Sequence, residues 1–193
     1  MLQTLEMPSS APFPRADSNE QIISGRAGKM KKLLLLRHAK SNRDGSDAAD
    51  FDRPLSDRGI KAAAIVGRYL GAKKFQPDLV LSSPAERARQ TAMLFMKAAG
   101  ITAELRFDER IYEAHASRLL SVVKQIDEDV NIALLVGHNP GFEDLLSALT
   151  GVVHHMPTAA LAYLTMEIEK WNDAQDGCAT LKWMITPKDL ETN

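Results

Sequence analysis

The chain has 193 residues, 45% of them hydrophobic and 25% charged, and its formal net charge is −1 at pH 7. This length predicts one domain large enough to bury a core, and the composition excludes fibrous, disordered and disulfide-built classes. Basic and acidic residues are interspersed, which excludes the global charge pattern of a nucleic-acid binder, so any anion site has to be local.

The first 29 residues differ in character from the rest of the chain. They contain Pro8, Pro12 and Pro14, several serines and mixed charges, with few apolar residues that could join a core. Such a stretch cannot bury enough apolar surface to offset the entropy of ordering it. We therefore expect a disordered N-terminal extension over residues 1–29 and one folded domain over residues 30–193.

From residue 33 onward, short apolar runs alternate with longer stretches of helical periodicity. The runs are nearly continuous, which is typical of strands covered by helices on both faces. Strands are predicted at 33–36, 79–81, 132–136, 161–168 and 179–185, and helices around 60–70, 88–95, 119–126 and 142–149. This order predicts an α/β domain with three layers, α/β/α, around a mostly parallel central sheet.

Side chains suited to phosphate chemistry follow three of the predicted strands. Arg37 and His38 come after the first strand, Arg87 lies shortly after the second, and His138 follows the third. Because ligands bind at the carboxyl ends of strands in open α/β sheets, we expect these four side chains to meet. Guanidinium groups match phosphate oxygens, and a neutral imidazole can accept a phosphoryl group. Taken singly, each residue is more often structural, but coincidence at three strand ends favours a site with His38 as nucleophile.

The starts of the two helices next to these residues add backbone donors. Ser83 is predicted to cap the second helix, with Pro84 at its first position and Glu86 completing a capping box. Asn139 is predicted to cap the fourth helix in the same way. Exposed N–H groups at helix starts bind anions, so Asn139 is a further candidate phosphate ligand.

The cysteine and histidine content predicts neither a disulfide nor a bound metal. Cys178 is the single cysteine, and no Cys and His spacing resembles a zinc site. We expect a cytoplasmic protein without a cofactor. No apolar run reaches the roughly 20 residues that a membrane span needs, and no secretory signal pattern is present, so we expect no membrane insertion.

At these residues the chain resembles the histidine phosphatase superfamily, whose signature is a strand followed by Arg-His-Gly or Arg-His-Ala. Here the signature reads Arg37-His38-Ala39, and the resemblance continues through residues 82–91 and the Gly-His pair at His138, in the same order. Within the superfamily the chain is most similar to the SixA-type phosphohistidine phosphatases. They share its short domain, its Gly-His-Asn-Pro motif and its Asp-Arg-Pro-Leu-Ser loop at residues 52–56.

The resemblance implies a phosphoglycerate mutase-like fold and gives roles to individual residues. His38 would be the phosphorylated nucleophile, with Arg37, Arg87 and His138 as phosphate contacts. The general acid stays open. Glu109 stands at the position, after the third strand of the family fold, where superfamily members often carry a glutamate. Glu113 is the alternative. Glu109 is equally well explained as a plain surface charge. A phosphoramidate leaving group departs easily once protonated, which reduces the need for a strong acid.

Ala39 and Lys40 stand where phosphoglycerate mutases carry Gly-Glu, and this departure favours hydrolysis over phosphoryl re-donation. The resulting hypothesis is a metal-independent phosphatase that acts on phosphohistidine in a protein, such as a phosphotransfer domain, through covalent phospho-His38. A phosphatase of small phosphorylated metabolites is the alternative. A non-catalytic phosphate-recognising module is a third reading, against which the intact His38 argues.

Overall fold

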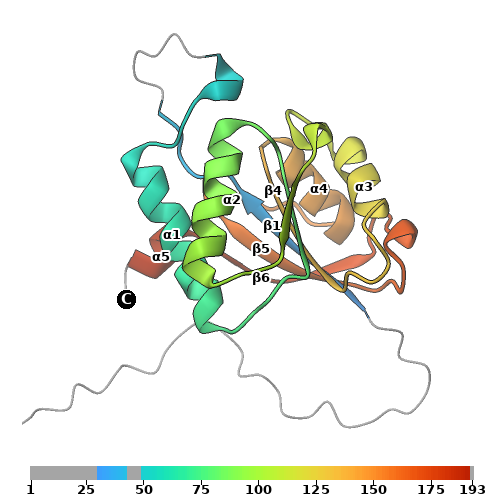
Figure 1. Cartoon of the computed structure of the whole chain (residues 1–193). Coiled ribbons are helices and arrows are strands. Elements are labelled where there is room, and N and C mark those ends of the chain that lie inside the picture. The colour runs from blue at the N-terminus through green and yellow to red at the C-terminus, as the bar shows by residue number, and fades with distance from the viewer. Residues whose placement is uncertain (1–29, 43–48, 192–193) are drawn as a thin grey trace, which may run out of the picture.

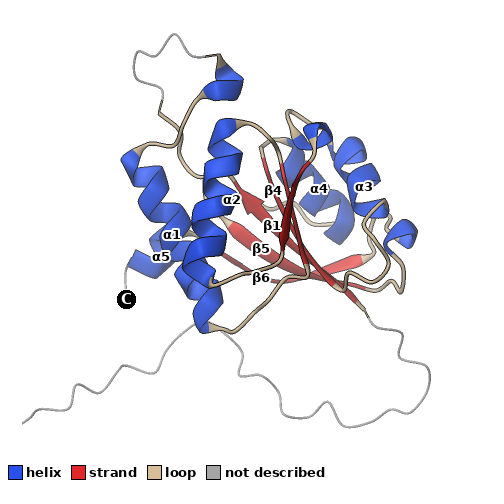
Figure 2. Ribbon diagram, viewed as in Figure 1, coloured by secondary structure: helices blue, strands red, loops and turns tan. Residues whose placement is uncertain are grey.

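A computed structural model describes residues 30–42 and 49–191 of the chain, so the predicted disordered extension over residues 1–29 lies outside the described residues. The fold is built around six strands: β1 (Lys31–Arg37), β2 (Leu79–Ser82), β3 (Glu104–Phe107), β4 (Ile132–Gly137), β5 (Leu161–Met166) and β6 (Ala179–Ile185). They form one sheet in the order β3-β2-β4-β1-β5-β6, which runs through the middle of the molecule (Figure 2).

The sheet is parallel in the part that carries the candidate site. β2 pairs in parallel with both β3 and β4, and β4 pairs in parallel with β1. The remaining two pairs of this sheet, β1–β5 and β5–β6, are antiparallel. The prediction of a mostly parallel sheet is therefore confirmed, and the carboxyl ends of β1, β2 and β4 lie at one edge.

Helices cover both faces of the sheet. The helix α1 (Asp57–Ala72), together with α2 (Glu86–Ala99) and α5 (Pro187–Glu191), covers one face, and α3 (Ala116–Lys124) and α4 (Gly141–Thr150) cover the other (Figure 1). The predicted three-layer α/β/α architecture is thereby confirmed. None of the helices in the described part of the chain combines the length and apolarity required to cross a bilayer.

The apolar run in β1 explains how the two cores form. Leu34 and Leu36 pack in one cluster with residues of α1 and α2, whereas Leu33 and Leu35 pack in the other with residues of α3 and α4. All four leucines are fully buried. Side chains alternate between the faces of a strand, so a strand covered on both faces has to be apolar at every position. Burial of each leucine contributes about 1.5–3 kcal/mol.

The periodicity of the sequence did not reveal β3. This strand lies at the edge of the sheet and reads Glu-Leu-Arg-Phe, with Glu104, Arg106 and Phe107 exposed. Arg106 pairs with Glu104 and with Asp127 on the surface. Charges on an edge strand block pairing with other chains, and they also remove the apolar pattern by which strands are recognised.

Candidate active site

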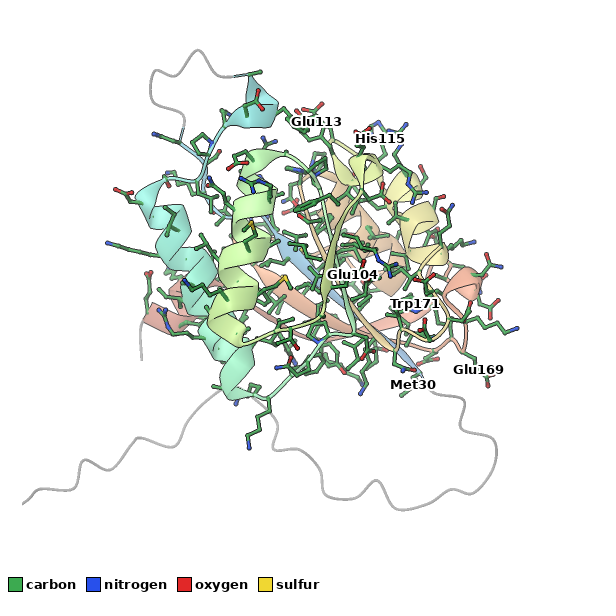
Figure 3. All side chains as sticks on the ribbon, viewed as in Figure 1. Met30, Glu104, Glu113, His115, Glu169 and Trp171 are labelled. Atoms are coloured by element: carbon green, nitrogen blue, oxygen red, sulfur yellow. The ribbon has the colours of Figure 1, made fainter. Side chains whose placement is uncertain are left out.

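A cavity of about 510 Å³ lies where the carboxyl ends of β1 and β4 meet the start of α2. The side chains predicted from the three strand ends all border it, together with residues from the connecting loops: Arg37, His38, Lys40, Ser41, Asp50, Arg53, Arg87, Glu113, His138, Asn139 and Thr158. Figure 3 shows Glu113 at the opposite end of the molecule from Met30, which precedes β1. The structure thus brings together the residues that the sequence places far apart.

His38 is held with one ring nitrogen bound and the other available. Its Nδ1 lies 2.7 Å from the carbonyl oxygen of Ala39. A carbonyl only accepts, so Nδ1 carries the proton and Nε2 carries the lone pair. Burial, followed by the nearby guanidinium groups of Arg87 and Arg37, lowers the pKa of His38 to about 4, although its bond to Ala39 opposes the shift. The ring is therefore neutral at pH 7 and can act as a nucleophile.

Arg37 ends β1 and presents an unpaired donor beside His38. Its Nη1 donates to the carbonyl oxygen of Met156 at 2.7 Å, which anchors one end of the guanidinium group. Its Nε is buried without a partner in the structure. A buried donor left unpaired costs about 1–3 kcal/mol, so an incoming oxygen anion at this point would be favoured.

Arg87 lies in the first turn of α2, as the sequence predicted, and is only 5% exposed. Its Nη1 donates to the carbonyl oxygen of Asp50 at 2.5 Å and its Nη2 to Asp50 Oδ2 at 2.8 Å. Arg53 forms a second ion pair with Asp50. Partial burial opposes the effect, but Arg87 and Arg53 hold the pKa of Asp50 below its usual value. The ionised Asp50 therefore holds the guanidinium group of Arg87 in a fixed orientation.

His138 follows β4 and faces His38, with 5.0 Å between the ring centroids. Its Nε2 lies 2.8 Å from Ser83 Oγ, whereas its Nδ1 is buried without a partner in the structure. Burial, followed by the charges of neighbouring groups including Arg87, lowers the pKa of His138 to about 3. Both imidazoles of the site are therefore neutral at pH 7.

The predicted capping box at α2 is wrong. The helix begins at Glu86, after Ala85, and no side chain caps it. The Ser83 hydroxyl instead accepts from the N–H of Ala85 at 3.3 Å and contacts His138. The Glu86 carboxylate does not reach back, because it accepts from the side chains of Arg89 and Gln90.

The predicted cap at α4 is also wrong, but Asn139 does lie at the site. The helix begins at Gly141, one residue later than a cap at Asn139 requires. Asn139 Nδ2 donates to the carbonyl oxygen of Met156 at 3.1 Å. Arg37 donates to the same oxygen, so Asn139 and Arg37 are fixed at one wall of the cavity.

Of the two candidate acids, only Glu113 borders the cavity. Glu109 lies in a short 3₁₀ turn, Glu109–Ile111, where it is exposed and outside the cavity lining. Glu113 is also exposed, but it stands at the rim and has a φ of 46°, in the left-handed region. Such a backbone conformation is uncommon for a non-glycine residue and is enriched at functional sites.

The arrangement is suited to an oxygen anion. Arg37 and Arg87 supply cationic donors in the same cavity as His38, and His138 supplies a second, neutral ring. Within residues 30–42 and 49–191, no cluster of three or more His, Cys, Asp or Glu side chains is placed to hold a metal ion. The cationic side chains that line the cavity are Arg37, Lys40, Arg53 and Arg87, and such charges can stabilise a bound phosphoryl group.

Comparisons with known proteins agree with this geometry. The profile of the histidine phosphatase superfamily (branch 1) matches residues 33–133. An uncharacterised protein of Mycobacterium tuberculosis is 35% identical over 165 residues, which cover 79% of this chain and 100% of that protein.

Two solved structures described as phosphohistidine phosphatase SixA are also similar. The one from Agrobacterium tumefaciens is 30% identical with a TM-score of 0.68, covering 81% of this chain and 98% of its own. The one from Nakamurella is 28% identical with a TM-score of 0.72, covering 82% and 96%. These matches and the site support phosphatase activity. The chain belongs to the histidine phosphatase superfamily, in which it is similar to the SixA proteins.

Proposed function

We propose that this protein is a metal-independent phosphatase that removes the phosphoryl group from phosphohistidine in a protein, through a covalent intermediate on His38. The observation that carries the proposal is the state of His38. Its Nδ1 is bound to the Ala39 carbonyl, and its neutral ring borders a cavity that it shares with two arginines. Such a ring presents the lone pair of Nε2 to a phosphorus atom held by the guanidinium groups.

The reaction then proceeds in two displacements. In the first, the Nε2 lone pair of His38 forms a bond to phosphorus as the P–N bond of the substrate breaks. The departing imidazole nitrogen keeps the electron pair and takes a proton from solvent, and the attacking water of the second step returns one proton to solvent. In the second, water attacks the phosphorus, the bond to His38 breaks, and inorganic phosphate leaves. His38 returns to its neutral form, so both steps balance without an outside oxidant or reductant.

Arg37, Arg87 and His138 bind the phosphoryl oxygens during these displacements. Arg37 Nε, which has no partner in the structure, donates to one phosphoryl oxygen, and Arg87 donates to another while Asp50 holds its orientation. His138, whose ring lies 5.0 Å from that of His38, has its Nδ1 without a partner in the structure and therefore available to a phosphoryl oxygen. These fixed donors stabilise the charge that spreads over the equatorial oxygens in the transition state.

The rim of the cavity favours a substrate carried by a protein over a small metabolite. Lys40, Asp50 and Glu113 line the cavity and are exposed, so a phosphoryl group on a protein surface can reach His38. The imidazole of a phosphohistidine is a good leaving group once protonated, so it needs little help from an acid. This agrees with a site in which the candidate acid, Glu113, lies at the rim. The similarity to the SixA proteins supports the same substrate class.

The test compares a protein phosphorylated chemically on histidine with small phosphate esters, in the presence of a chelator. We expect turnover of the phosphohistidine protein to exceed that of sugar and nucleoside phosphates, and to disappear in His38→Ala. His115→Ala is the matched control, because His115 is exposed and does not border the cavity. Preferred turnover of a small phosphate would favour the metabolite phosphatase. Phosphate binding without any hydrolysis would favour the recognition module.

A further inference from the structure

The hydroxyl of Ser83 makes a contact that the helix start does not require. Ser83 follows β2 and is fully buried. Its Oγ lies 2.8 Å from His138 Nε2 and accepts from the N–H of Ala85 at 3.3 Å. The neighbouring hydroxyl, Ser82 Oγ, donates to the carbonyl oxygen of Ser83 and so takes no part in this contact.

The hydrogen between Ser83 and His138 can occupy one of two places. Either the Ser83 hydroxyl donates to Nε2 of His138, or His138 Nε2–H donates to the Ser83 oxygen. A neutral imidazole has one N–H and one lone pair, so the first arrangement puts the His138 proton on Nδ1 and the second leaves Nδ1 with a lone pair. Because burial lowers the pKa of His138 to about 3, the ring is neutral at pH 7 and has one of these two tautomers.

The buried surroundings favour the first arrangement. In the second, the Ser83 oxygen would accept from both Ala85 and His138, and its own O–H would be a buried donor for which the structure shows no acceptor. His138 Nδ1 would also present a lone pair toward the phosphoryl oxygens, which repel it. In the first arrangement the hydroxyl donates to His138 and accepts from Ala85, and Nδ1–H belongs to a ring that borders the cavity proposed to bind the phosphoryl group. The second arrangement thus leaves both the Ser83 hydroxyl hydrogen and the Nδ1 lone pair without a partner, whereas the first leaves only Nδ1–H without one.

We infer that Ser83 is a positioning residue that keeps the proton of His138 on Nδ1, so that His138 acts as a neutral hydrogen-bond donor to the phosphoryl group. The position of the proton follows from the contacts of Ser83 and His138 and does not depend on the substrate. Its effect on turnover rests on the proposed function. The assignment gives the buried hydroxyl a reason beyond local backbone bonding and explains how an uncharged His138 can bind an anion.

Nuclear magnetic resonance of protein labelled with ¹⁵N-histidine tests the proton position without substrate. Long-range ¹H–¹⁵N correlations distinguish a protonated ring nitrogen from one with a lone pair, and His138→Gln identifies the signals among those of the five histidines. At pH 7 we expect His138 with Nδ1 protonated and Nε2 unprotonated. A proton on Nε2 in the unmodified protein overturns the inference, whatever the enzyme hydrolyses.

Two serine variants then separate positioning from packing. Ser83→Ala should move a substantial share of the His138 proton to Nε2 and lower kcat about 10-fold, less than the 10²–10³ that follows complete removal of a donor. Ser82→Ala is the control, because Ser82 is equally buried beside Ser83 but its hydroxyl has no contact with His138. It should leave the His138 spectrum and kcat unchanged. An unchanged His138 tautomer in folded Ser83→Ala contradicts the assignment. If that variant does not fold, the spectrum of the unmodified protein still decides.

Discussion

Replacing Arg87 tests how much of the transition-state stabilisation comes from a single guanidinium group. Arg87 is 5% exposed and fixed by two hydrogen bonds to Asp50, so it approaches a phosphoryl group without having to be reorganised. Loss of one such pre-oriented donor lowers kcat by about 10² or more, which corresponds to about 2.7 kcal/mol of activation free energy. We therefore expect Arg87→Ala to reduce kcat at least 100-fold. Arg87→Lys should fall between, because lysine keeps the charge but loses the forked geometry.

The assay is steady-state hydrolysis of p-nitrophenyl phosphate with a chelator present, with kcat and KM measured separately. Arg89→Ala is the matched control, since Arg89 lies on the same helix but pairs with Glu86 at the surface. Asp50 retains its ion pair with Arg53 in Arg87→Ala, so the variant should remain folded, which circular dichroism can verify. A folded Arg87→Ala with near-normal kcat would remove Arg87 from the site and refute this reasoning.

Three further predictions concern other groups of the site. Glu113→Gln should slow hydrolysis of phenyl phosphate, whose phenolate is a poor leaving group, more than hydrolysis of phosphohistidine. Glu109→Gln should change neither rate. Equal losses on both substrates would exclude Glu113 as the acid. Asp50 is 45% exposed in its side chain, so Asp50→Asn should remove a screened repulsion of about 0.2–1 kcal/mol and lower the inhibition constant of inorganic phosphate roughly 1.4- to 5-fold; a higher constant would show that the orientation of Arg87 by Asp50 matters more. Because the pKa of His38 falls from 6.5 to about 4 on folding, the unfolded chain binds that proton first, and stability declines as pH falls through this window. In urea unfolding at several pH values, His38→Gln should make this decline shallower by up to about 1.4 kcal/mol per pH unit, and an unchanged slope would contradict the lowered pKa.

The architecture was predictable because the buried strands are apolar at nearly every position. The runs beginning at Leu33, Leu79 and Ile132 correspond to β1, β2 and β4, and the helical periods between them correspond to α1, α2 and α3. The edge strand β3 was not predictable in this way, because its side chains are mostly exposed and Glu104 and Arg106 pair with other charges. The spacing of apolar residues reflects which side chains are buried, so a strand with few buried side chains cannot be recognised from that spacing.

The candidate site was predictable where a residue follows a buried strand. Parallel strands end at one edge of the sheet, which brings His38, Arg87 and His138 together whatever their separation in sequence. Asp50 was missed because it begins a short 3₁₀ turn, Asp50–Asp52, for which neither periodicity nor strand register indicates which way a side chain points. Ser83 was assigned to a helix cap because capping patterns are local, whereas its actual partner, His138, is 55 residues away.

Covalent catalysis by His38 is tested most directly by locating the phosphoryl group on the protein during turnover. The reaction should be stopped under conditions that preserve phosphoramidates, with a chelator present throughout, and the protein digested and analysed by mass spectrometry. We expect phosphate on His38 in the unmodified protein and in His115→Ala, and none in His38→Ala. Phosphate on a serine or a carboxylate, or full turnover by the His38→Ala protein, would contradict it.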